Sequence, residues 1–332
     1  MAEDRDRPSP RLNAWGLLAV ALVALGACAA GGPHPETPSA ERPSGQSIAG
    51  ADGTPLALSV WPAERPRAVI LGLHGYGDYA ETTFEAAGPD WAAAGITTYA
   101  YDQRGFGRNP SRARWPGADA LIADARAAAV EIRARHPDLP LVVLGVSMGG
   151  GVALAAAPEI AADGIVLVAP AIWGGAALNP LHRTLAWLAA LTVPERRFTG
   201  EGVVRIRPTD NIEALRRLAR DPLYLGPPSA REIFGLVRIT DRAAAAAEKA
   251  ELPALLLLGA RDEIVPEAAV RRVFAQRPGP GCVRRFEDGW HMLLRDLGAA
   301  RVRAEIAGWV VGGPGAARCP TGGTVRTAKK AP

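Results

Sequence analysis

The chain of 332 residues is 48% hydrophobic and 22% charged, so it can bury a large core and does not have the composition of a disordered protein. Its net charge is +4, but Lys and Arg are spread along the chain and aromatic residues make up only 6%. A nucleic-acid-binding surface would need a basic stripe interleaved with aromatic side chains, so we expect no nucleic-acid partner.

The N-terminal segment has the pattern of an export signal. The charged stretch MAEDRDRPSPR is followed by residues 14–27, which carry no charge. This run fits the apolar region of a signal peptide, about 7 to 15 residues, better than the roughly 20 residues that span a bilayer. It closes with Leu25, Gly26, Ala27 and Cys28, which resembles the lipobox of bacterial lipoproteins, whose Cys becomes the lipidated first residue.

We therefore expect residues 1–27 to be a lipoprotein signal peptide and Cys28 to carry the lipid. Acyl chains on Cys28 would attach an exported protein to the membrane of the bacterial cell envelope. By the same resemblance this would be the outer membrane in a host with two membranes. An ordinary signal peptide with an incidental Cys28 is the alternative.

Segments rich in Gly, Pro, Ser and Ala frame the folded region. Residues 28–47 and 312–332 have this composition and no apolar period, which is typical of a flexible linker and a flexible tail. Apart from Cys28, the chain has two cysteines, Cys282 and Cys319. In an oxidising compartment they could form one disulfide between the tail and the body, with two free thiols as the alternative.

Between these limits, short apolar runs alternate with helical stretches. Helices are predicted over residues 81–95 and 118–136, and strands over 55–61, 68–75, 96–102, 139–147, 164–170 and 253–262. Continuous Val, Ile and Leu strands separated by helices predict the α/β class, with a mostly parallel central sheet covered by helices on both faces. Ligands of such sheets bind at the carboxyl ends of the strands.

The alternation stops between residues 172 and 240. Leucines at 181, 185, 188 and 191 have helical spacing, and the stretches NIEALRRLARD and AREIFGLVRIT are also amphipathic, with no strand between them. We expect residues 172–240 to form a helical cap over the active edge of the sheet. The core would then consist of residues 48–171 and 241–311.

The stretch GVSMG at 145–149 is a G-x-S-x-G motif. The apolar run LVVLG leads into it and the Ala-rich run GGVALAAA follows it, which is the strand-turn-helix context of a nucleophile elbow. Ser147 is therefore the candidate nucleophile. The alternative is a Gly-rich turn with only a structural role.

A serine nucleophile needs a general base, and the base needs a partner that fixes its tautomer. Asp262 follows a buried strand and His291 follows another strand, in the order Ser, Asp, His that is typical of α/β hydrolases. Asp288, three residues before His291, is a rival acid, although a carboxylate so close in the chain is more typical of a turn.

Acyl transfer also needs hydrogen-bond donors for the oxyanion. The stretch LGLHGYGDY follows a strand, and we expect the backbone N–H groups of Tyr76 and Met148 to be these donors. His74 could be a second base, a metal ligand or a structural hydrogen-bonding group. With five His in the chain and no cluster at ligand spacing, we favour the structural role and expect no metal or cofactor.

Five motifs together resemble the monoglyceride lipase and lysophospholipase-like group of α/β hydrolases, the serine aminopeptidase S33 type. They are HGYG at 74–77, DQRGFG at 102–107, GVSMG at 145–149, GARD at 259–262 and GWH at 289–291. The resemblance spans about residues 48–311. Residues 108–110, Arg-Asn-Pro, depart from it, because that group has a small polar residue soon after Gly107.

This resemblance implies an α/β-hydrolase fold, a triad of Ser147, Asp262 and His291, oxyanion donors at Tyr76 and Met148, and a cap with an apolar acyl entrance. The hypothesis is a serine carboxylic-ester hydrolase that acts on monoacylglycerols, lysophospholipids or similar single-acyl esters. An amidase or peptidase on the same fold is the alternative, and a non-catalytic envelope binding protein is a more distant one. The oligomeric state stays open.

Overall fold

The computed structural model describes residues 45–174, 179–198 and 206–314. One sheet has the strand order β1-β2-β4-β3-β5-β6-β7-β8. From β4 through β3 to β8 all neighbouring strands are parallel, whereas β2 runs antiparallel to β1 and β4. The strands are β1 Ser47–Ala49, β2 Pro55–Trp61, β3 Ala68–Leu73, β4 Ile96–Tyr101, β5 Leu141–Val146, β6 Gly164–Val168, β7 Ala254–Gly259 and β8 Gly281–Phe286.

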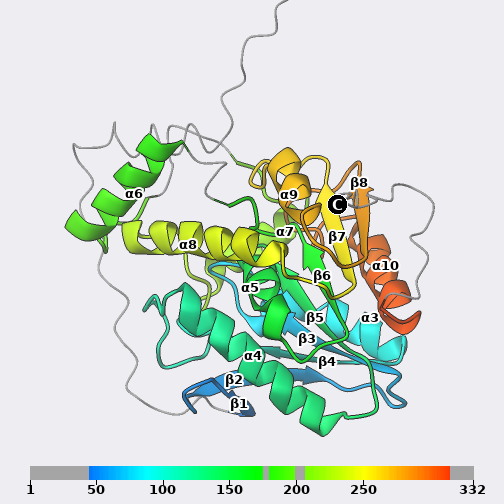
Figure 1. Ribbon diagram of the computed structural model, residues 1–332. Coiled ribbons are helices and arrows are strands. Elements are labelled where there is room, and N and C mark those ends of the chain that lie inside the picture. The colour runs from blue at the N-terminus through cyan, green and yellow to red at the C-terminus, as the bar shows by residue number, and fades with distance from the viewer. Residues whose placement is uncertain (1–44, 175–178, 199–205, 315–332) are drawn as a thin grey trace, which may run out of the picture.

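The expected mostly parallel sheet with helices on both faces is confirmed (Figure 1). One core contains side chains of the strands and of α4 (Ala118–Arg135), α5 (Met148–Ala156), α8 (Ala230–Ala247) and α9 (Glu267–Phe274). The opposite core contains side chains of α2 (Ala80–Phe84), α3 (Ala87–Ala93) and α10 (Ala299–Val311). Both faces are covered, so the strands contain few polar residues.

β5 shows how the two cores share a strand. Leu141 and Val143 belong to the first core, while Val142 and Leu144 belong to the second. This alternation follows from the two-residue period of a strand. After β5 and α5, a short 3-10 helix (Ala157–Glu159) leads toward β6.

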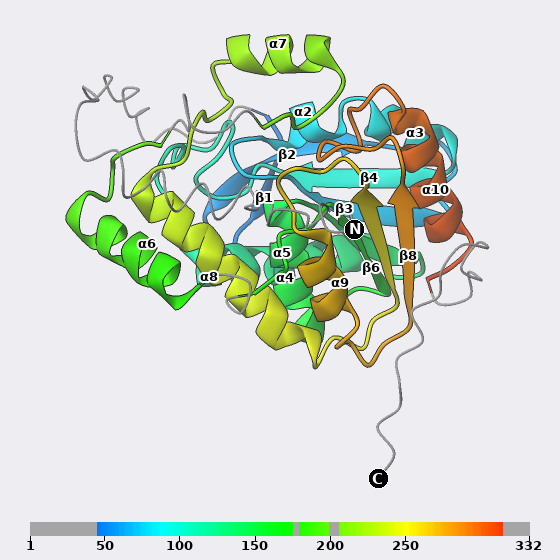
Figure 2. The ribbon, with the colours of Figure 1, turned by 90° about the horizontal axis from the view of Figure 1, so that it is seen from above.

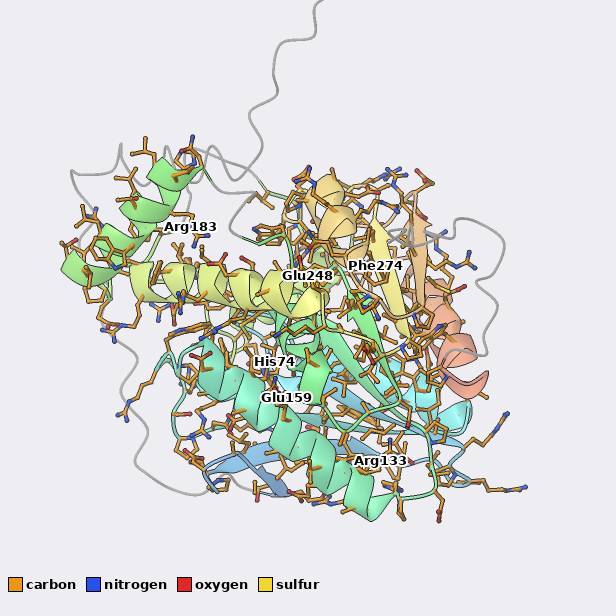
Figure 3. The ribbon with its side chains drawn as sticks, viewed as in Figure 1. His74, Arg133, Glu159, Arg183, Glu248 and Phe274 are labelled. Atoms are coloured by element: carbon orange, nitrogen blue, oxygen red, sulfur yellow. The ribbon has the colours of Figure 1, made fainter. Side chains whose placement is uncertain are left out.

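Residues 169–253, which we call the inserted segment, connect β6 to β7. Its described residues form α6 (Pro180–Thr192), α7 (Ile212–Arg220) and α8, and contain no strand. Figure 2 shows α6 and α7 standing out from the molecule at separate places. Arg183 is labelled on α6 in Figure 3. It forms a bidentate ion pair with Asp241 of α8, at 2.9 and 2.8 Å.

Residue 240, where the sequence placed the end of the cap, lies inside α8. The helix is continuous from Ala230 to Ala247 and it packs on α5. Ile239, Ala243 and Ala247 are fully buried in the sheet's core. The first part of α8 thus belongs to the predicted cap and its second part covers the sheet.

Several predicted features lie wholly or partly outside the described residues. These are the signal peptide 1–27, Cys28, Cys319, most of the linker and the end of the tail. Cys282 in β8 is disulfide-bonded, and its pairing with Cys319 stays a prediction. Among the described helices, none is both long and apolar enough to cross a membrane.

Candidate active site

Ser147 sits on a sharp turn between β5 and α5. Its backbone has φ 52° and ψ −114°, a conformation that is strained for a residue with a side chain. A Cβ atom at Gly145 would lie 2.2 Å from the Gly149 carbonyl oxygen, and one at Gly149 would lie 2.2 Å from the Leu73 oxygen. Only glycine fits these two positions, so the motif holds the Ser147 side chain at the carboxyl end of the sheet.

His291 and Asp262 complete a hydrogen-bonded line that begins at Ser147. The Ser147 Oγ atom is 2.9 Å from His291 Nε2, and His291 Nδ1 is 2.9 Å from Asp262 Oδ2. Asp262 Oδ1 accepts the backbone N–H groups of Ile264 and Val265, at 2.8 and 3.0 Å. These two bonds fix the carboxylate, which in turn orients the imidazole.

Asp288, the rival acid, lies away from this line. Its side chain is about half exposed and forms an ion pair with Arg301. Asp262 is 5% exposed in its side chain and contacts the imidazole directly. Of the two carboxylates, the structure brings only Asp262 to His291.

The pKa values of this pair move in opposite directions. Burial alone would lower the pKa of His291, but the charge and the hydrogen bond of Asp262 raise it above its usual 6.5. Burial alone would raise the pKa of Asp262, but the His291 charge and the hydrogen bonds from His291, Val265 and Ile264 lower it. Asp262 is therefore ionised near neutral pH and favours the protonated form of His291.

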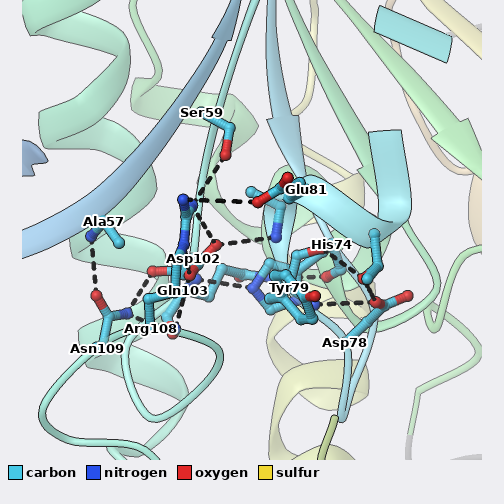
Figure 4. A network of polar contacts seen from close by, with 12 residues as sticks. Ala57, Ser59, His74, Asp78, Tyr79, Glu81, Asp102, Gln103, Arg108 and Asn109 are labelled. Carbon is cyan, nitrogen blue, oxygen red and sulfur yellow. Dashed lines mark hydrogen bonds and ion pairs between the residues drawn. The ribbon is translucent and has the colours of Figure 1, made fainter. Parts of the chain in front are cut away.

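His74 has a structural role, as favoured from the sequence. It is fully buried, its Nε2 accepts the Gln103 N–H at 2.8 Å, and its carbonyl oxygen accepts the Gln103 side-chain amide at 2.7 Å. Figure 4 shows the network around it. Burial lowers the pKa of His74, so the ring is neutral. Its hydrogen bond with Gln103 connects the loops after β3 and β4.

The residues that depart from the family pattern belong to the same network (Figure 4). Arg108 forms an ion pair with the fully buried Asp102 at 2.9 Å. The Asn109 side chain accepts the Ala57 N–H at 2.9 Å and donates to the Asp102 carbonyl at 2.6 Å. Asp102 also accepts the Ala80 N–H at 3.0 Å, so this loop holds the start of α2 in place.

The backbone N–H groups of Tyr76 and Met148 are available as donors. Within the described residues, neither N–H has an acceptor. Met148 opens α5, whose N-terminus favours negative charge. A Cβ at Gly75, next to Tyr76, would lie 3.5 Å from the Ser147 Cβ, so both loops meet at the serine.

A cavity of about 550 Å³ lies against Ser147 and His291. Its wall is mostly apolar and comes from the core and from the inserted segment, with Trp173, Leu215, Leu218, Leu236 and Val237 among the contributors from the latter. Such a cavity suits an apolar ligand held by a few polar groups. Within the described residues, no group of three or more His, Cys, Asp or Glu side chains is placed to hold a metal ion.

Sequence reasoning missed several polar residues around the site. The cavity wall includes Asp78 and Arg295, which form an ion pair. Asp296 accepts the Trp290 N–H at 2.7 Å and so holds the residue before His291. The Asp78–Arg295 pair joins residues 217 positions apart, and the Asp296 contact spans six residues without a recognised motif, so neither could be predicted from a local pattern.

Glu232 was also missed, although it did leave a signal. The stretch Ser229-Ala230-Arg231-Glu232 has the spacing of a capping box ahead of an apolar run, and the structure shows both of its hydrogen bonds. This pattern would have predicted where α8 begins.

A comparison with protein families identifies the family of this chain. The model of the family described as serine aminopeptidase, S33, matches residues 64–298. The chain belongs to this family. The resemblance seen in the sequence is thereby confirmed, and this S33-family protein is a hydrolase.

Individual relatives of this hydrolase agree with that assignment. The monoacylglycerol lipase of Mycolicibacterium smegmatis is 27% identical over 280 residues, which cover 81% of this chain and 97% of that protein. The monoglyceride lipase of Mus musculus is 26% identical over 282 residues, covering 79% and 89%. The crystal structure of Paleococcus ferrophilus monoacylglycerol lipase is 20% identical, with a TM-score of 0.64, and covers 77% and 98%. The likeness to solved structures supports the α/β-hydrolase fold expected from the sequence.

The titration of His291 tests the electrostatics of this site. In the wild-type protein we expect the imidazole NMR signals of His291 to titrate above pH 6.5, because Asp262 stabilises the charged ring. In Asp262→Asn the charge of this carboxylate is gone, and burial, which lowers the pKa of His291, is opposed only by the smaller charge effect of Asp296. The pKa of His291 should therefore fall below 6.5. Asp288→Asn is the matched control and should leave the pKa unchanged. A wild-type pKa below 6.5, or an equal shift in both variants, would contradict this account.

Proposed function

We propose that this hydrolase cleaves carboxylic esters with a single acyl chain, namely monoacylglycerols and similar lipids such as lysophospholipids, through an acyl-enzyme on Ser147. The observation that carries the proposal is the hydrogen-bonded line from Ser147 Oγ through His291 to Asp262, with 2.9 Å at each step. These are the distances that proton transfer from alcohol to imidazole requires.

The acylation step follows from this geometry. Ser147 Oγ attacks the acyl carbon while its proton passes to His291 Nε2, and the new imidazolium is stabilised by Asp262. The carbonyl oxygen becomes an oxyanion that accepts the N–H groups of Tyr76 and Met148, and one such donor is worth about 3 to 4 kcal/mol of the barrier. The intermediate then expels the alcohol, which takes the proton from His291.

Deacylation repeats these steps with water. His291 removes a proton from a water molecule, whose oxygen attacks the acyl carbon of the ester on Ser147. A second oxyanion forms at the same two N–H groups. Its collapse releases the fatty acid and returns the proton to Ser147 Oγ.

The substrate class is supported by the cavity, by the relatives and by the surface. The cavity wall is mostly apolar, and an acyl chain gains about 0.8 kcal/mol for each methylene that it buries. The relatives above are named as lipases of monoacylglycerols. On α6, the side chains of Leu181, Trp187, Leu188 and Leu191 are about half exposed or more, which suits work at a lipid surface. We propose that the inserted segment serves as a cap at the acyl entrance.

Replacement of the nucleophile tests both the mechanism and the substrate. Ser147→Ala should lower kcat on 1-monoacylglycerols by about 10⁵ to 10⁶-fold, because no oxygen remains to attack the acyl carbon. Turnover is measured across acyl lengths and also on amino-acid anilides. Ser47→Ala, at an exposed position in β1, is the control and should match the wild type. Near-normal turnover by Ser147→Ala would rule out the mechanism. A preference of the wild type for the anilides would show that the activity is that of a peptidase and not of a lipase.

We also propose that the protein is exported and attached to the cell envelope through a lipid on Cys28. The support is the uncharged run 14–27, which ends directly before this Cys. Cys28→Ser should move the protein from the membrane pellet to the soluble fraction, because the acyl chains are lost. Cys319→Ser should stay in the pellet. A wild-type N-terminal peptide without the mass of a lipid would contradict the proposal.

A further inference from the structure

Tyr76 has two hydrogen-bonding groups with different surroundings. Its backbone N–H lies in the loop beside Ser147, as described above. Its hydroxyl donates to Oε2 of Glu232, at 2.8 Å. Glu232 stands in the first turn of α8, within the inserted segment, 156 residues further along the chain.

The Glu232 carboxylate is buried and joins three segments. Its side chain is 5% exposed, so it needs partners to offset the loss of water. Besides the Tyr76 hydroxyl, Oε2 accepts the Ser229 N–H at 2.7 Å and lies 3.5 Å from Arg197 Nη1. One oxygen atom therefore ties the loop after β3 to the start of α8 and to the chain that follows α6.

The chain around Arg197 is itself attached to the start of α8. The Phe198 N–H donates to the Pro228 oxygen at 3.0 Å, and the Ala230 N–H donates to the Arg196 oxygen at 2.9 Å. Ser229 also closes the capping box with the Glu232 N–H, at 3.3 Å. Glu232 thus sits on a rigid corner of the inserted segment.

A second contact holds the residue after Tyr76. The Leu225 N–H of the inserted segment donates to the Gly77 oxygen at 2.7 Å, and a Cβ at Gly77 would lie 2.5 Å from the Leu225 oxygen. The Tyr76 ring packs edge-on against Phe106, with 5.6 Å between ring centroids. The loop is therefore fixed at its side chain and at its following peptide.

Burial and the neighbouring Glu232 carboxylate raise the pKa of the Tyr76 hydroxyl far above its usual value. The hydroxyl thus stays protonated and remains a donor throughout the range in which the enzyme could work. The contact to Glu232 is a charge-assisted hydrogen bond, which is stronger than one between neutral groups.

From these contacts we propose that Glu232 is a positioning residue, which holds the Tyr76 backbone N–H at the oxyanion site through the Tyr76 hydroxyl. The inference rests on the proposed function, because it assigns the Tyr76 N–H to the oxyanion. An oxyanion donor acts only from the correct place, and an error of about 1 Å in position can cost 10²-fold in rate. The arrangement of the inserted segment would thereby set the catalytic power of the site.

Tyr76→Phe tests the proposal, because it removes the hydroxyl and keeps the ring and the backbone N–H. On a short, soluble p-nitrophenyl ester we expect kcat to fall about 10-fold or more, with KM little changed. The affinity for a trifluoromethyl ketone, which forms an oxyanion on the serine, should fall by a similar factor. Tyr79→Phe is the matched control, since it removes a hydroxyl that donates to Asp221 of the inserted segment at 2.7 Å.

Two variants of Glu232 give an independent measurement. Glu232→Ala should lower kcat as Tyr76→Phe does, while Glu232→Gln should recover most of the loss, because its amide oxygen can still accept the Tyr76 hydroxyl. Thermal unfolding of each variant reports any general loss of stability.

The possible outcomes separate the two proposals. If Tyr76→Phe has the same kcat as Tyr79→Phe, or if its KM alone changes, the positioning role is overturned. An inactive Ser147→Ala would in that case still support the proposed function. If Ser147→Ala is active, both are overturned. Recovery of kcat by Glu232→Gln but not by Glu232→Ala supports the positioning role.

Discussion

The strained backbone of Ser147 is the constraint on which the rest of the site depends. A residue with φ 52° and ψ −114° keeps that conformation only where its surroundings enforce it. Here Gly145 of β5 lies against the Gly149 carbonyl of α5, and Gly149 lies against the Leu73 carbonyl at the end of β3. Neither contact leaves room for a side chain on the glycine. The serine is thus presented to His291 by the packing of a strand on a helix, and the other parts of the site must reach this fixed point.

The remaining parts are brought there by polar ties between loops at the carboxyl ends of the strands. His74 joins the loop after β3 to the loop after β4, and Asp102 with Arg108 supports the start of α2. Glu232 adds a tie from the inserted segment to Tyr76. Buried groups of this kind are costly unless each is satisfied, so together they select one arrangement of loops that would otherwise be mobile.

Much of this architecture could be predicted, because it depends on residue patterns that are local in the sequence. The apolar runs predicted the parallel strands, and Ser147, Asp262 and His291 each lie in a short motif beside a strand.

Other features depend on distant contacts. Residues 81–95 were expected to form one helix, but Pro89 lacks the N–H that a helix interior needs, and the structure has α2 and a separate α3 with Pro89 in its first turn. β1 is only three residues long, and α8 continues through residue 240 because its second half packs on α5. The ties from Glu232 to Tyr76 and from Asp78 to Arg295 join residues that are more than 150 positions apart.

A crystal structure of the enzyme inactivated by an alkyl fluorophosphonate tests the central claim most directly. The account predicts a covalent bond from phosphorus to Ser147 Oγ and a phosphoryl oxygen about 2.7 to 3.1 Å from the backbone nitrogens of both Tyr76 and Met148. It also predicts that the alkyl chain lies in the cavity between the core and the inserted segment. An adduct on another residue, or a phosphoryl oxygen that faces away from both nitrogens, would contradict it.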